Sequence, residues 1–101
     1  MRFTQITFRH MAHSASLGER IRDLSGRLEE RFPKIERCRA AVEEFRTAEK
    51  AHQFKVTVDV LAAGRTLVAS AHGGDIEIVL REVFAELDRK VPDFLARRLP
   101  A

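Results

Sequence analysis

The sequence has one cysteine, no tyrosine, no tryptophan and no long apolar run, and these absences exclude several classes of protein. Because a single thiol, Cys38, cannot form an intrachain disulfide, we expect a reducing, cytoplasmic setting rather than a disulfide-rich secreted domain. The first ten residues lack the apolar segment of a secretory signal, and no stretch approaches the roughly 20 apolar residues of a membrane span. We therefore expect no membrane partner.

Motifs for catalysis, metal binding and cofactor binding are also missing. Common zinc patterns do not fit the spacing of the four histidines, His10, His13, His52 and His72. The segment Gly73 to Asp75 precedes a helix but lacks the lysine and hydroxyl of a phosphate loop, and its aspartate favours helix capping over anion binding. No nucleophile and base stand in a recognisable set. We expect no enzymatic activity, metal, cofactor or small-molecule substrate.

What the chain does have is enough apolar residues for one core, together with nearly balanced charge. Its 101 residues, of which 45% are hydrophobic, suffice for one two-layer domain and are too few for two, so we expect a single domain over residues 1–101. The 18 basic and 15 acidic residues give a formal net charge of +3. That charge permits an anionic partner without requiring one.

Hydrophobic periodicity predicts the order strand, helix, three strands, helix. Apolar and polar residues alternate over 3–10, 37–45, 54–60 and 66–71, and apolar residues recur at helical spacing over 16–32 and 76–91. Ser16 and Glu19 have the form of a capping box that would start the first helix, which Pro33 would stop. Asp75 is the expected N-cap of the second helix. Pro92 would end or kink that helix, leaving residues 92–101 as one further turn and a short, frayed tail.

This order predicts a two-layer α/β (α+β) sandwich with a four-stranded mixed sheet. The first strand–helix–strand crossover makes two strands parallel, and a hairpin turn at residues 62–64 adds antiparallel ones. Each helix carries one apolar stripe, so both should cover the same sheet face. The other face should be exposed to solvent and carry Arg39, Glu43, Lys55, Thr57 and Asp59.

The first helix has nearly equal numbers of basic and acidic residues, but they segregate when the helix is wound at about 100° per residue. Four basic residues line one flank of the apolar stripe, namely Arg20, Arg27, Arg31 and Lys34. Long arginine side chains often cover the border of a core and pair with acidic neighbours at helical spacing. A polyanion-binding ridge is the alternative, and the residue pattern alone leaves both open.

Several segments resemble, in their order and spacing, the ribosome hibernation-promoting factor and ribosome-associated inhibitor family, also described as the sigma-54 modulation protein family. They are ITFRHM (residues 6–11), Ser16-Leu17-x-Glu19-x-Ile21, Arg27-Leu28-Glu29, IERCRAAVE (residues 35–43) and Gly73-Gly74-Asp75. The resemblance covers almost the whole chain. It implies the β-α-β-β-β-α fold of that family in its short form.

The resemblance also implies a function. Such a protein binds the small ribosomal subunit in the channel used by mRNA and tRNA, and it silences idle ribosomes under stress. Its two helices would present a cationic trough to the phosphates of 16S-type rRNA, and phosphate contacts supply salt-dependent affinity without base readout. The candidate RNA-binding residues are Arg20, Arg27, Arg31, Lys34, Arg81, Arg89, Lys90, Arg97 and Arg98.

The last helix departs from the family pattern. Glu77 and Glu86 occupy places where family members usually carry an aromatic residue and a lysine, and Arg81, Arg89 and Lys90 do not share one face. These differences favour a second hypothesis, a diverged interaction module that forms a weak homodimer through its sheet without binding ribosomes. General recognition of double-stranded RNA is a third, which equal affinity for any duplex would favour.

Overall fold

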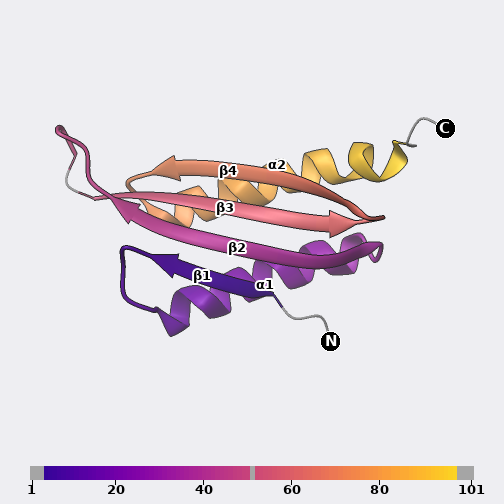
Figure 1. The fold of residues 1–101 in the computed structure, drawn as a ribbon, viewed down its shortest axis with the longest axis horizontal. Helices are drawn as coiled ribbons and strands as arrows, with labels where there is room; N and C mark the ends of the chain where they lie inside the picture. Colours follow the sequence, from indigo (N-terminus) through magenta and orange to yellow (C-terminus); the bar gives the residue numbers. More distant parts are fainter. Residues whose placement is uncertain (1–3, 51, 98–101) are drawn as a thin grey trace.

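The computed structural model describes residues 4–50 and 52–97, which form a four-stranded sheet with two helices on one face (Figure 1). In chain order the elements are β1 (Gln5–Arg9), α1 (Ala15–Arg31), β2 (Ile35–Phe45), β3 (Gln53–Ala62), β4 (Arg65–Gly73) and α2 (Ile76–Ala96). This confirms the predicted two-layer β-α-β-β-β-α fold. The start of the first strand was predicted at Phe3, which lies outside the described residues.

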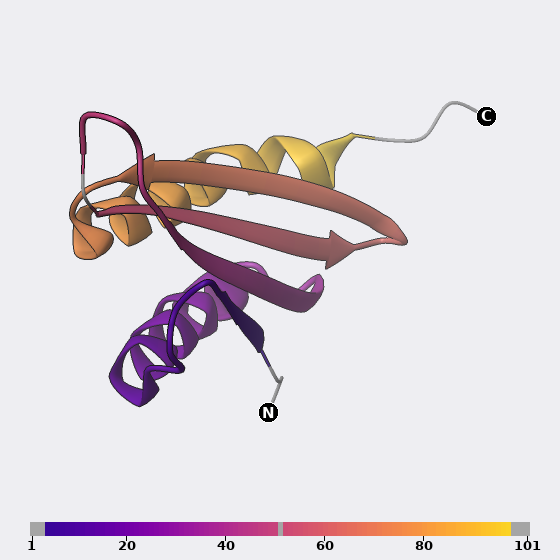
Figure 2. The ribbon, with the colours of Figure 1, turned by 60° about the vertical axis from the view of Figure 1, so that its left-hand side comes forward.

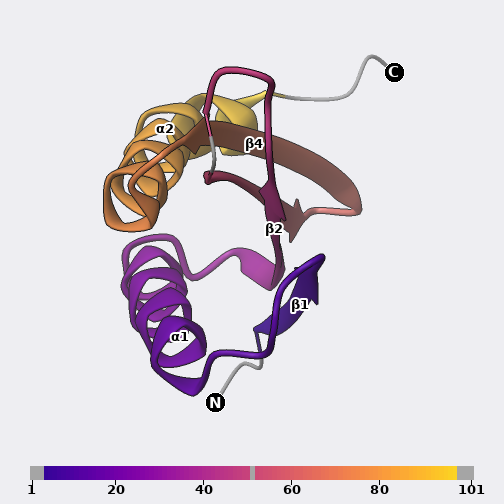
Figure 3. The same ribbon diagram turned by 90° about the vertical axis from the view of Figure 1, so that its left-hand side faces the viewer.

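The strands lie in the order β1-β2-β3-β4. β1 runs parallel to β2, and the other two pairs are antiparallel, as the crossover and hairpin predicted. Viewed along the strands, both helices lie on the same side of the sheet (Figure 3). The open face carries Arg39 and Lys55 exposed, with Glu43, Thr57 and Asp59 partly exposed, so the prediction of a solvated face is confirmed.

The core lies between the sheet and the helices. Cys38, Val42, Val56, Val58 and Val60 point into it from β2 and β3, because alternate residues of a strand face one side. The helices contribute buried residues from both apolar stripes: Ile21 and Leu28 from α1, and Val79, Leu80, Val83, Phe84, Leu87 and Val91 from α2.

A two-residue turn joins β3 to β4. Ala62 pairs with Arg65, and the residues between them, Ala63 and Gly64, have positive φ angles of 54° and 72°. Two consecutive residues in this region form the type I′ turn, whose twist matches that of the flanking strands. The predicted hairpin is therefore confirmed, with β4 longer at both ends than its sequence pattern indicated.

The N-cap of α1 is Ser14, so the capping box predicted at Ser16 is wrong. The Ser14 backbone is extended and its side-chain oxygen accepts from the Leu17 N–H at 3.3 Å, while its carbonyl accepts from Gly18 at 3.0 Å. Ser16 lies within the helix, where its hydroxyl contacts that of Ser14 at 3.4 Å. Either serine has the chemistry of a cap, and the earlier one takes the role.

The buried face of α1 includes Ile21 and Leu28 of the predicted stripe but is shifted to one side of it. Gly18 and Ser25 are buried alongside Ile21, and the Ser25 hydroxyl lies 2.7 Å from that of the buried Thr4, just before β1. Leu24 is consequently only partly buried and faces the second helix instead.

Asp75 caps α2 as predicted, with its carboxylate accepting from the N–H groups of Glu77 and Ile78 at 3.0 and 3.4 Å. The helix does not end at Pro92 but continues to Ala96. A proline removes one helical hydrogen bond, yet the half-buried Leu95 extends the apolar face beyond it and packs against the core. Within the described residues, no helix is long and apolar enough to cross a membrane.

Candidate nucleic-acid interface

The two helices lie side by side and leave an open groove of about 520 Å³ between them. Both run antiparallel to the strands that precede them, so they are parallel to each other (Figures 2 and 3). The groove is lined by apolar residues and by charged residues of both signs: Leu24, Leu28, Phe84 and Ala85, and Arg27, Glu30, Arg31, Arg81 and Asp88. Three arginines and two carboxylates therefore make its charge mixed.

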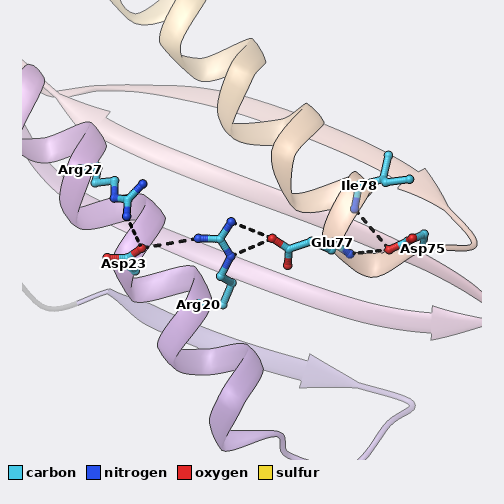
Figure 4. A network of polar contacts seen from close by, with 6 residues as sticks. All are labelled: Arg20, Asp23, Arg27, Asp75, Glu77 and Ile78. Carbon is cyan, nitrogen blue, oxygen red and sulfur yellow. Dashed lines mark hydrogen bonds and ion pairs between the residues drawn. The ribbon is translucent and has the colours of Figure 1, made fainter.

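Two ion pairs cross from α1 to α2. One guanidinium nitrogen of Arg20 lies 2.7 Å from Glu77 Oε1, and Arg20 Nε donates to the same oxygen at 2.8 Å (Figure 4). Arg31 lies 2.8 Å from Asp88 Oδ1. Both pairs join residues 57 positions apart in sequence, which fits two parallel helices in constant register. The predicted cationic trough is therefore wrong as stated, because carboxylates of α2 partner two of its arginines.

The Arg20–Glu77 pair shifts the ionisation of both groups. The hydrogen bond from Arg20 lowers the pKa of Glu77, and the same bond raises the pKa of Arg20. A carboxyl whose pKa is lowered in the folded state stabilises the fold above its unfolded pKa, and this contribution is lost as the pH falls through the folded value. At neutral pH the two side chains are therefore held together as ions.

Arg27 and Arg81 carry the most available positive charge in the groove. The side chain of Arg27 is 64% exposed and lies 3.1 Å from Asp23, a carboxylate that Arg20 also contacts at 3.5 Å (Figure 4). Arg81 is exposed on α2 and forms no ion pair with any residue of 4–50 or 52–97. Among the described residues, neither guanidinium group forms an ion pair with a carboxylate of the opposite helix.

The remaining candidates lie elsewhere. Lys34 is exposed in the turn after α1 and does not line the groove. Arg89, Lys90 and Arg97 lie on the opposite flank of α2, beside β4, and Lys90 pairs with Glu86 at 2.5 Å. Arg98 lies outside the described residues. The eight candidates that the structure describes therefore do not form one surface, and what each of the nine binds stays a prediction.

Sequence reasoning missed Arg65, a basic residue at the start of β4. Its guanidinium lies 4.6 Å from the centre of the Phe94 ring and donates to the carbonyls of Phe94 and Arg97 at 2.8 and 3.1 Å. A cation at these carbonyls satisfies acceptors that the end of α2 leaves unpaired. No local motif announces this contact, because the hairpin and the helix end meet only in the folded chain.

Comparison with known proteins decides the family. The family model described as sigma 54 modulation protein / S30EA ribosomal protein matches residues 4–98. The chain belongs to this family. It is a non-enzymatic family, which confirms the prediction that the chain is not an enzyme. No curated protein sequence matches the chain closely enough to count as a relative.

Two solved structures share the fold at low sequence identity. A ribosomal subunit interface protein from Coxiella burnetii is 17% identical with a TM-score of 0.78, and the match covers 93% of this chain and 98% of that one. The N-terminal domain of Protein Y from Thermus thermophilus is 15% identical with a TM-score of 0.71, covering 93% of this chain and 99% of that domain. At such identities the likeness concerns the fold alone.

Proposed function

We propose that the protein is a cytoplasmic, ribosome-associated translation inhibitor, a hibernation factor that binds small-subunit rRNA in the channel used by mRNA and tRNA. The observation that carries this proposal is the family match over residues 4–98. The fold shared with a protein described as a ribosomal subunit interface protein supports it. In this proposal the groove between α1 and α2 faces the RNA.

The groove suits the sugar–phosphate backbone better than bases. Arg27 and Arg81 project from different helices, so one stretch of backbone can be held from two sides. Phe84, the aromatic residue that lines the groove, is only 6% exposed and offers no free ring face for base stacking. Recognition would therefore depend on the shape of folded RNA and on the positions of its phosphates.

The carboxylates in the groove favour selectivity over high affinity. A phosphate that misses the arginines meets Glu30 or Asp88, and like charges placed close together oppose binding. An arbitrary RNA duplex would therefore bind less well than a folded site whose phosphates match the arginines. This argues for a defined rRNA site rather than for general recognition of double-stranded RNA.

Co-sedimentation with purified small subunits tests the proposal. We expect the protein to pellet with the small subunit at 50 mM salt. Its affinity should fall about 10- to 150-fold by 200 mM, as two to four phosphate contacts require. Large subunits serve as the control and should retain little protein. A protein that stays in the supernatant with small subunits at 50 mM salt would contradict the proposal.

A further inference from the structure

The outer edge of β4 is a long, unprotected strand edge. β4 forms one border of the sheet, and β3 is its only neighbouring strand within residues 4–50 and 52–97 (Figure 1). From Thr66 to Ala71 it carries no charge and no proline, and Val68 is 52% exposed. Natural proteins usually blunt such edges with charges, prolines or bulges, because an open edge pairs with other strands. At this edge the chain lacks those devices.

The hairpin determines which backbone groups of β4 point outward. The type I′ turn closes on the pair Ala62 and Arg65, and hydrogen-bonded and non-hydrogen-bonded pairs alternate from there along an antiparallel ladder. The N–H and C=O groups that face away from β3 therefore belong to every second residue, namely Thr66, Val68, Ser70 and His72. These four residues offer eight backbone groups to another strand.

The flank of α2 beside this edge is polarised. Glu82 and Glu86 line a hollow with Ser70, Ala71 and His72 at one end of β4, and Arg89, which borders the hollows at both ends, is its one arginine. At the other end, basic residues gather around Leu67 and Phe94, with Asp93 as the one acidic member: Arg89, Lys90 and Arg97. Arg65 adds a further cation there. The edge thus has an acidic end and a basic end.

We propose that two copies of the chain pair their β4 strands antiparallel, about a two-fold axis at Ala69. In this register Thr66 lies opposite His72 of the second copy and Val68 lies opposite Ser70 of the second copy, so all four outward-facing residues are paired. Small side chains at the centre, Ala69 and Ala71, leave room on the helix side. The two sheets then join into one of eight strands.

The distribution of charge along this edge is the reason that we expect it to pair with a second copy of the chain. An antiparallel two-fold pairing brings the acidic end of each copy against the basic end of the other, so Glu82 lies nearest Arg97 of the second copy. Within the described part of the chain, neither Glu82 nor Arg97 forms an ion pair of its own. Lys90 and Glu86 already pair within one copy and contribute less.

The pairing does not use the groove, because α1, which forms one wall of the groove, and β4 lie on different sides of α2 (Figure 3). Sedimentation equilibrium tests it first. The wild-type mass should rise with concentration from 11.5 kDa towards twice that value. Ser70→Lys places two lysines close together across the axis and should weaken the dimer about tenfold or more. Thr7→Lys adds the same charge at an exposed hydroxyl residue of β1 and should leave the dimer unaffected.

A charge swap tests the register. Glu82→Lys and Arg97→Glu should each weaken the dimer about tenfold, because each sets like charges against one another twice. An equimolar mixture of the two variants should recover the wild-type dissociation constant within a few-fold, since every heterodimer restores both opposite-charge pairs. The proposal would be overturned if the wild type stays monomeric at millimolar concentration. It would also be overturned if Ser70→Lys and Thr7→Lys weaken the dimer equally, or if the mixture of Glu82→Lys and Arg97→Glu dimerises no more tightly than either variant alone.

Discussion

Reversing Arg27 and Arg81 to glutamate should raise the dissociation constant for the small ribosomal subunit about 100-fold at low salt, or about 2.7 kcal/mol. Each reversal removes a charge-assisted contact with phosphate and puts a carboxylate in its place. The fold should persist, because among the described residues Arg27 forms an ion pair only with the neighbouring Asp23, and Arg81 is exposed without an ion pair. Co-sedimentation and the thermal midpoint, measured together, separate binding from stability.

A matched control for this double variant is Arg46→Glu combined with Lys50→Glu. Both residues are exposed between β2 and β3, away from the groove, and the change in net charge is the same. Equal loss in both variants would mean that overall charge drives binding. Arg31 is a poorer choice for reversal, because it holds Asp88 and its change would also disturb the contact between the helices.

Neutralising the two carboxylates that cross the groove should have the opposite effect. We expect Glu77→Gln with Asp88→Asn to tighten binding to the small subunit about tenfold and to steepen its salt dependence. The change releases Arg20 and Arg31 for phosphate and removes two charges that repel it. Exposed ion pairs add little to stability, so the thermal midpoint should change only slightly.

The control for this variant is Glu36→Gln with Glu49→Gln, which removes two exposed carboxylates away from the groove. It should change affinity far less. If instead Glu77→Gln with Asp88→Asn weakens binding, then the ion pairs serve to hold the helices in register for the ribosome. In that case Arg20 and Arg31 would not be phosphate ligands.

Periodicity was sufficient to predict the fold because each element has a clear apolar face. The alternation around Val56 and Val58 marks a central strand, and both residues are fully or almost fully buried. Asp75 was recognisable as a cap because glycines precede it and an apolar stripe follows. The error at the start of α1 arose because two serines there compete as caps. At Pro92 the sequence left open whether the helix ends or kinks, and the further turn that it predicted is present up to Ala96.

The site was harder to predict because its charges are balanced across elements. Winding α1 alone correctly placed Arg20, Arg27 and Arg31 on the flank that faces α2. It could not supply their partners, which depend on the register between two helices that are far apart in sequence. One signal was present: Glu77 and Asp88 are spaced as Arg20 and Arg31 are, about three helical turns apart.

The most direct test of the proposed interface is an electron cryomicroscopy map of the small subunit saturated with the protein. The account predicts that the groove between α1 and α2 faces the RNA, with rRNA phosphates within hydrogen-bonding distance of Arg27 and Arg81. The open face of the sheet should point away from the RNA. A map in which the protein binds through that open face, or in which both arginines point to solvent, would contradict it.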